Sequence, residues 1–169
     1  MRVIKEVHSL AAASTMAMMI YNHLSENPET VIGVATGNSM IPVYADLQTI
    51  LHKHPLHLSK VKWFALDEYI GVPATHSSSF RSYLLKHLIR PLSLEEGSLY
   101  LPSPDIDYEK MIQEAGGIDL QLLGVGVNGH IGFNEPGSEK QSRTRIVKLD
   151  SKTIESNKPD LKDLPKIPE

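Results

Sequence analysis

The segment at residues 128–138 holds the densest group of side chains able to do chemistry. It contains one histidine, His130, one carboxylate, Glu135, and two carboxamides including Asn128, among glycines that let the backbone approach a ligand closely. The spacing of five between His130 and Glu135 suits a loop in which the carboxylate orients the imidazole and fixes its tautomer. We therefore predict that this loop transfers protons near neutral pH.

A second group consists of Asp67 and Glu68, which follow the apolar run at residues 61–66. Neighbouring side chains on an extended backbone point to opposite sides, so one of the two carboxylates should face the site. A carboxylate that is ionised at neutral pH can act as a general base. Taken alone, the pair is better explained as a solvated acidic turn.

The third group, Thr36, Gly37 and Ser39, follows another apolar run and precedes a helical pattern. Hydroxyls and backbone N–H groups at the start of a helix suit an anion, most often a phosphate. The segment matches neither G-x-G-x-x-G nor G-x-x-x-x-G-K-[ST], so no nucleotide is indicated. An ordinary capped turn is the alternative.

Other reactive side chains rank lower. Three serines could be the nucleophile of a Ser-His-acid triad, but none lies in a G-x-S-x-G elbow, so acyl transfer is disfavoured. Three clustered histidines are interpreted as surface residues, with a metal site as the weaker alternative. These serines are Ser39, Ser79 and Ser138, and the histidines are His52, His54 and His57.

Alternating strands and helices should position these groups. Apolar patterns predict strands at residues 2–7, 31–35, 61–66, 99–101 and 118–125, the last being the most convincing buried strand. Helices are predicted between them, the first capped by Ser9. The alternation predicts an α/β fold, an open and mostly parallel sheet with helices on both faces in three Rossmann-like αβα layers. Ligands of such sheets bind outside the carboxyl ends of the strands, where all three polar groups stand.

Length and composition limit the remaining choices. The chain of 169 residues has the size of one domain, which we divide into an α/β catalytic domain at residues 1–150 and a lid or tail at 151–169. Prolines in that tail leave little to pack, so we expect it to be mobile. A formal net charge of −3 and the absence of cysteine argue against nucleic acid, an acidic membrane surface and disulfides. Without a signal peptide or a long apolar window, a cytoplasmic protein is expected.

Four motifs together resemble the glucosamine-6-phosphate deaminase (isomerase) family. They are Asp-Glu-Tyr-Ile-Gly from residue 67, His76 with Ser79, the loop at residues 126–138, and Ser-Arg-Thr-Arg from residue 142. The 6-phosphogluconolactonases share the fold and a Gly-x-Gly-x-x-Gly-His loop. The sequence Phe-Asn-Glu-Pro-Gly from residue 133 favours the deaminase branch.

The resemblance implies a hydrolase of amino-sugar metabolism, in N-acetylglucosamine catabolism. Glucosamine 6-phosphate and water would give fructose 6-phosphate and ammonia, with no cofactor or metal. Asp67 would move a proton between C2 and C1, and His130 would open the sugar ring. Glu135 with Asn128 would hold His130, and because Asn128 is no anion, Glu135 must supply the charge. The residues left for the phosphate are Thr36, Gly37, Ser39 and Lys158. The partner is a small sugar phosphate, and a homo-oligomer is left open.

The same resemblance predicts departures from the family. Members usually continue past a Pro-Lys pair like that at residues 165–166, into a segment with a Gly-Lys whose lysine binds the phosphate. They also have an arginine at the position of Lys158. We therefore expect a C-terminally shortened chain, either a fragment or a short form. Ser138 and Arg145 match an allosteric site, but Val147 replaces its lysine, which argues against allosteric activation.

Two other functions stay open. One is a regulator that binds sugar phosphates without turnover, and the other is a 6-phosphogluconolactonase. Ammonia release from glucosamine 6-phosphate separates the enzyme from the regulator, and hydrolysis of 6-phosphogluconolactone would reveal a lactonase.

Overall fold

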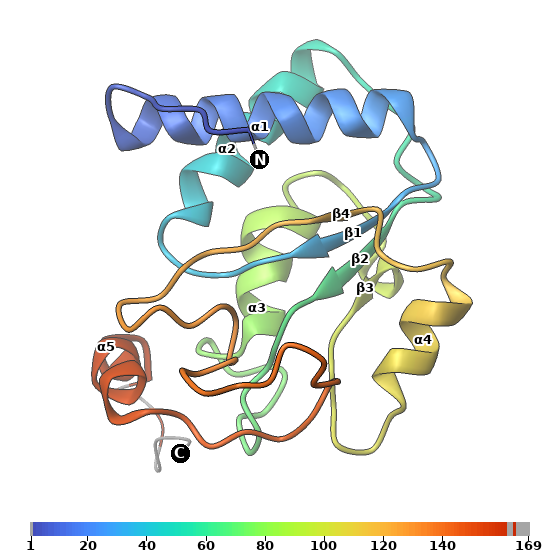
Figure 1. The fold of residues 1–169 in the computed structure, drawn as a ribbon. Coiled ribbons are helices and arrows are strands. Elements are labelled where there is room, and N and C mark those ends of the chain that lie inside the picture. The colour runs from blue at the N-terminus through green and yellow to red at the C-terminus, as the bar shows by residue number, and fades with distance from the viewer. Residues whose placement is uncertain (1, 162–163, 165–169) are drawn as a thin grey trace.

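The computed structural model describes residues 2–161 and 164, and its strands form one parallel sheet (Figure 1). The strand order is β3-β2-β1-β4, and every pairing between neighbours is parallel. In chain order the elements are α1 (Ser9–Glu26), β1 (Val31–Val34), α2 (Met40–Lys53), β2 (Lys62–Ala65), α3 (Phe80–Leu84), the π-helix η1 (Leu85–Ile89), the 3₁₀ helix η2 (Glu96–Ser98), β3 (Leu99–Tyr100), α4 (Tyr108–Glu114), β4 (Leu120–Gln121) and α5 (Ser151–Leu161).

Helices cover both faces of this sheet, as predicted. On one face, α1, α2 and the π-helix pack on a core that includes Ile32 and Trp63, both almost fully buried. On the other face, Phe64 stacks on Tyr100 with ring centroids 4.7 Å apart and contacts Tyr108 of α4. Figure 1 shows α1 and α2 on one side of the strands and α4 on the other. The alternation of buried side chains along β1 and β2 therefore supplies two cores.

Two predicted strands are wrong in extent. Residues 2–7 contain no strand, and Val7 is 89% exposed, so the apolar side chains of this segment do not enter a sheet. The strand predicted at 118–125 is reduced to β4, and Val125 beyond it is 76% exposed. Among the described residues β4 pairs with β1 alone, so the apolar run leaves the ladder after two residues. The first helix also differs, since the His8 side chain, not Ser9, caps α1 by accepting from the Ala11 N–H.

The segment after residue 150 packs more than its composition indicates. Residues 151–161 form α5, in which Thr153 and Leu161 are buried. Leu161 lies in a small apolar cluster with Tyr69 and Leu149, beside the residues that follow β2. The expectation of little packing is therefore wrong for α5, while the prolines at 165 and 168 lie outside the described residues.

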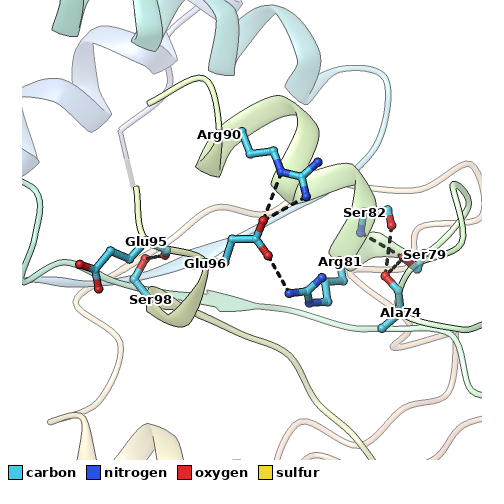
Figure 2. A network of polar contacts seen from close by, with 8 residues as sticks. All are labelled: Ala74, Ser79, Arg81, Ser82, Arg90, Glu95, Glu96 and Ser98. Atoms are coloured by element: carbon cyan, nitrogen blue, oxygen red, sulfur yellow. Dashed lines mark hydrogen bonds and ion pairs between the residues drawn. The ribbon is translucent and has the colours of Figure 1, made fainter. Parts of the chain in front are cut away.

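A polar network fixes the α3 end of the fold (Figure 2). The Glu96 carboxylate accepts from Arg90 at 3.0 and 3.2 Å and from Arg81 at 3.0 Å, so η2 is joined to α3 and to the end of the π-helix. Ser79, buried, caps α3 by accepting from the Ser82 N–H at 3.0 Å. Its hydroxyl donates to backbone carbonyls, so Ser79 is a helix cap and not a nucleophile.

Candidate active site

The carboxyl ends of β1 and β2 lie side by side, so the segments that follow them share one edge of the sheet. The register pairs Val34 with Ala65, and the Leu66 N–H donates to the Val34 carbonyl at 3.2 Å. The glycine-rich loop packs on this edge as well. A Cβ atom on Gly132 would lie 2.8 Å from the Leu66 side chain and 3.2 Å from Asp67 Oδ2, so only glycine leaves room there. Sequence reasoning correctly brought Asp67 and the His130 loop together.

Within the loop, Asn128 stands between the histidine and the glutamate. Its Nδ2 donates to Glu135 Oε2 at 2.8 Å, and its Oδ1 lies 2.7 Å from His130 Nδ1. The Asn128 oxygen also accepts from the His130 backbone N–H at 3.2 Å. His130 Nδ1 and Glu135 Oε2 are 3.8 Å apart, so the carboxylate orients the imidazole mainly through the amide. The sequence predicted a direct contact between Glu135 and His130. In the structure Asn128 lies between them and forms a hydrogen-bond relay from Glu135 to His130.

This relay decides which imidazole nitrogen carries the proton. A carboxylate only accepts hydrogen bonds, so Glu135 requires the amide nitrogen of Asn128 to face it. The amide oxygen must then face His130 Nδ1, which has to donate a proton to it. His130 Nε2 is thereby left as the nitrogen that accepts a proton.

Thr153 completes the relay from α5. Its Oγ1 lies 3.1 Å from His130 Nδ1, and its hydroxyl also bonds to Glu135. The second oxygen of Glu135 accepts from the Asp150 N–H at 3.2 Å. Burial raises the pKa of Glu135, but the bonds from Thr153, Asn128 and Asp150 outweigh it, so the net pKa lies below the ordinary value. The carboxylate therefore stays ionised while it orders its neighbours.

Sequence reasoning missed Thr153. The residue lies 23 positions from His130 in a segment read as a tail, and only the packing of α5 brings the two together. The residues next to Thr153 form no recognisable catalytic motif, so no pattern in the sequence would have identified it.

Asp67 and Glu68 have opposite environments. Burial, with a smaller contribution from the Glu68 charge, raises the pKa of Asp67 to about 7, although the Phe133 backbone N–H bonds to its carboxylate. Glu68 accepts from the backbone N–H groups of Phe80 and Arg81, each at 2.9 Å, and so holds the start of α3. The predicted division of the pair is seen: Asp67 faces the site, and Glu68 supports a helix.

The predicted phosphate turn lies beside this edge. Gly37 has φ +103° and is exposed, and its carbonyl accepts from the Tyr83 hydroxyl at 2.7 Å. Ser39 directly precedes α2 and makes no side-chain capping bond, so its exposed hydroxyl is not used to close the helix. Thr36 is half-buried at the end of β1. The turn thus presents small side chains at the start of a 14-residue helix.

Lys158 is less well placed than these residues. It lies on α5, is exposed, and its ammonium pairs with Glu155 of the same helix. The neighbouring Asn157 donates to the Tyr69 hydroxyl at 2.7 Å, which ties this part of α5 to the segment after β2. The structure therefore puts Lys158 on the helix that carries Thr153, without a contact to the turn at residues 36–39.

A cavity of about 630 Å³ reaches Asp67 from the side of α4. Its walls include Tyr108, Phe133 and residues 142–147. Arg145 in that segment donates to Asn134 and to Ser138, each at 3.0 Å.

Comparison with known proteins identifies the family. The family described as glucosamine-6-phosphate isomerases/6-phosphogluconolactonase matches residues 5–158. The chain belongs to this family. A glucosamine-6-phosphate deaminase from Clostridium botulinum is 38% identical over 165 residues, covering 93% of this chain and 68% of the relative. Glucosamine-6-phosphate deaminase 2 from Bacillus subtilis is 35% identical over 165 residues, covering 93% and 66%. This member of the family thus spans about two thirds of the length of these relatives.

Solved structures agree with this assignment. A structure titled as a monomeric glucosamine-6-phosphate deaminase matches all of this chain and 73% of its own, with TM-score 0.93 and 28% identity. The 6-phosphogluconolactonase from Trypanosoma brucei matches 85% of this chain and 67% of its own with TM-score 0.66 at 18% identity, which shows the shared fold alone. The α/β fold of the glucosamine-6-phosphate isomerase family is therefore confirmed.

One expectation about this family member is wrong. The sequence-based description of the reaction as that of a hydrolase does not hold, because the relatives are named deaminases and the family is described by isomerases. The supported class is a deaminase and isomerase of carbohydrate metabolism.

Two kinds of feature, a metal site and a membrane-spanning helix, are absent from the described residues. In residues 2–161 and 164, no three His, Asp or Glu side chains group so that they could hold a metal ion, which gives the histidines at 52–57 no support as a metal site. Within the same residues, none of the helices is both long and apolar enough to cross a membrane.

Proposed function

We propose that this chain carries the acid–base chemistry of a glucosamine-6-phosphate deaminase. The observation that carries the proposal is the juxtaposition of Asp67, whose pKa is about 7, with the loop that holds His130 in one tautomer. A base with a pKa near the working pH combines a useful ionised fraction with proton affinity. The deaminase relatives at 38% and 35% identity support the same reaction.

In the proposed first step, His130 opens the sugar ring. Its Nε2 takes the proton of the C1 hydroxyl and returns a proton to the ring oxygen as the C1–O5 bond breaks, so no net charge accumulates. The Asn128–Glu135 relay supports this step because it stabilises the imidazolium that forms for a moment.

In the second step, Asp67 acts on the open-chain sugar. Its carboxylate removes the proton from C2 while a proton of the substrate ammonium moves to O1, which gives a neutral enolamine. The carboxyl group then returns its proton to C1, which leaves an iminium at C2. Water adds to C2 and ammonia leaves, so the products are fructose 6-phosphate and ammonia. We assign the phosphate to Thr36, Gly37 and Ser39, supported by their place at the start of α2. Lys158 is proposed as a further ligand, which would have to exchange its pairing with Glu155 for the phosphate.

The proposal extends to organisation. Residues 1–150 would form the catalytic α/β domain, and residues 151–169 the segment that covers it, supported by the contacts of α5 with His130 and Tyr69. All acid–base groups come from one chain, so a homo-oligomer is not required, and a related deaminase is titled monomeric. A cytoplasmic location is part of the proposal, supported by the cysteine-free composition.

Ammonia release from glucosamine 6-phosphate tests this proposal. We expect wild-type chain to release ammonia and Asp67→Asn to lose about 10²–10⁴-fold in kcat, the range of general acid–base catalysis, with little change in sugar-phosphate binding. Binding of the substrate with no ammonia from the wild-type chain would support the regulator instead. Fructose 6-phosphate formed by Asp67→Asn at the wild-type rate would contradict the role of Asp67.

A further inference from the structure

Glu109, in the first turn of α4, holds a distant segment of the chain. Its carboxylate accepts from the backbone N–H and the hydroxyl of Thr144, both at 2.8 Å, and from Arg143 at 3.2 Å. The bond from the Thr144 N–H is the largest cause of a lowered pKa at Glu109, so the carboxylate is ionised at neutral pH. Three bonds to two consecutive residues fix the backbone of this segment, which a lone surface ion pair would not do.

The segment at residues 143–145, which Glu109 holds, contacts the catalytic loop at residues 126–138. Arg145, the next residue, donates to the Asn134 side chain at 3.0 Å. Asn134 in turn donates to the Ile131 carbonyl from its backbone at 3.1 Å and from its side chain at 3.2 Å. These bonds close the turn that contains Gly132 and Phe133, the two residues placed against Asp67.

The same segment forms a wall of the cavity that reaches Asp67. Besides Asp67, the charged and titratable groups that line this cavity come from the β2 end, α4 and residues 143–145, and they are Glu68, Tyr69, Asp107, Tyr108, Glu109, Arg143 and Arg145. Releasing the segment would admit water to Asp67 and loosen the turn that donates the Phe133 N–H.

We propose that Glu109 is a positioning residue, which acts through residues 143–145 and Asn134 to keep the catalytic loop closed on Asp67. Only the description of Asp67 as a catalytic base rests on the proposed function. Loss of the three bonds to Glu109 would expose the Asp67 carboxylate, and a more hydrated carboxylate gives up its proton at lower pH.

Titration of the Asp67 carboxyl by carbon NMR tests this proposal without any substrate, with the resonance assigned from Asp67→Asn. In Glu109→Ala we expect the midpoint to fall by about one pH unit toward the ordinary aspartate value near 3.9. Amide hydrogen exchange of Thr144 should accelerate in the same variant. The acid limb of the kcat/KM profile for ammonia release should move by the same amount.

Two variants separate the hydrogen bonds that Glu109 makes to Thr144 from the effect of its charge on Asp67. Glu109→Gln keeps an oxygen that accepts from Thr144 but has no charge, so its titration should stay within about half a unit of wild type. Glu114→Ala is the matched control, because Glu114 lies in the same helix and pairs only with Lys110 at 3.7 Å among the described ion pairs.

The outcomes are distinct. If the Asp67 midpoint fell as far in Glu109→Gln as in Glu109→Ala, the charge of Glu109 and not its bonds to Thr144 would set the Asp67 titration. That result would overturn the proposal. An unshifted Asp67 in Glu109→Ala with fast exchange at Thr144 would overturn it as well. Absence of ammonia from the wild-type chain would refute the proposed function alone, since the titration does not depend on it.

Discussion

Two carboxylates, Glu96 and Glu135, each organise a polar network, but the networks differ in kind. Glu96 binds the cations Arg81 and Arg90, and its side chain is 44% exposed (Figure 2). Glu135 binds neutral donors, among them Asn128, and its side chain is 13% exposed. The exposed network joins two pieces of chain, whereas the half-buried network sets the orientation of an amide and, through it, the proton on an imidazole. Charge alone therefore does not mark a functional carboxylate; the partners that it orders do.

The largest expected effect concerns Asp67, which lies against the loop that carries Glu135. Its folded pKa of about 7 exceeds its unfolded value, so the folded chain binds more protons between about pH 4 and 7, and stability falls as pH rises through that window. Asp67→Asn removes this cost and should raise the free energy of unfolding at pH 8 by about 1–3 kcal/mol. At pH 3.5 the gain should vanish. Urea titrations at both pH values measure it, and equal stability of the two proteins at pH 8 would argue against the burial of Asp67.

The next effect tests the relay itself. Glu135→Gln can turn its amide nitrogen toward Asn128, which allows the Asn128 amide to flip and the His130 tautomer to change. We expect kcat for ammonia release to fall by about 10–100-fold, the loss found when a group that orients a metal-bound histidine is removed. Nitrogen NMR of the imidazole should show a mixture of tautomers. An unchanged spectrum with Nδ1 protonated would show that Asn128 is held by other contacts.

A smaller effect is expected at Thr153. Thr153→Val keeps the shape but removes the hydroxyl, and kcat should fall by about tenfold, the loss expected for one buried hydrogen bond. Thr153→Ser should restore most of the rate. Thr49→Val is the control, because the Thr49 hydroxyl bonds to a backbone carbonyl within α2, away from the site. Equal rates for the Val and Ser variants would exclude a role of the hydroxyl.

The smallest effect is expected at Glu96. Glu96→Ala breaks the ion pairs of Figure 2. Because Glu96 orients no catalytic group and surface ion pairs contribute little stability, ammonia release should stay within about twofold of wild type. Thermal melting should show a small decrease. A loss of activity as large as that of Glu135→Gln would remove the distinction between the two networks.

Local patterns in the sequence predicted the parts of the site that lie within one segment. His130, Asn128 and Glu135 come from one loop, so their types and spacing already implied contact. The place of Asp67 followed from the rule that parallel strands end at the same edge. By contrast, Thr153 and Glu109 act across 23 and 35 positions, and their contacts depend on how α5 and α4 pack. Their distance along the chain hid these contacts.

The fold shows the same division. The buried strands β1 and β2 were predictable from continuous apolar runs between turn signals. The apolar run at 118–125 gave the same signal, but among the described residues β4 lies at an edge of the sheet, pairs with β1 alone, and leaves the ladder after Gln121. Periodicity reports which residues are apolar, and the number of neighbouring strands decides how far they stay paired.

The π-helix after α3 has a consequence for the tolerance of this region to insertions and deletions. Its wider turn places Leu85, Leu88 and Ile89 in the core, next to Leu84 of α3, and then brings Arg90 to Glu96. One residue removed from Leu85–Ile89 would restore ordinary α-helical winding and rotate Arg90 by about 100°. Point substitutions on the exposed side of this turn should therefore be accepted far more readily than any change in its length.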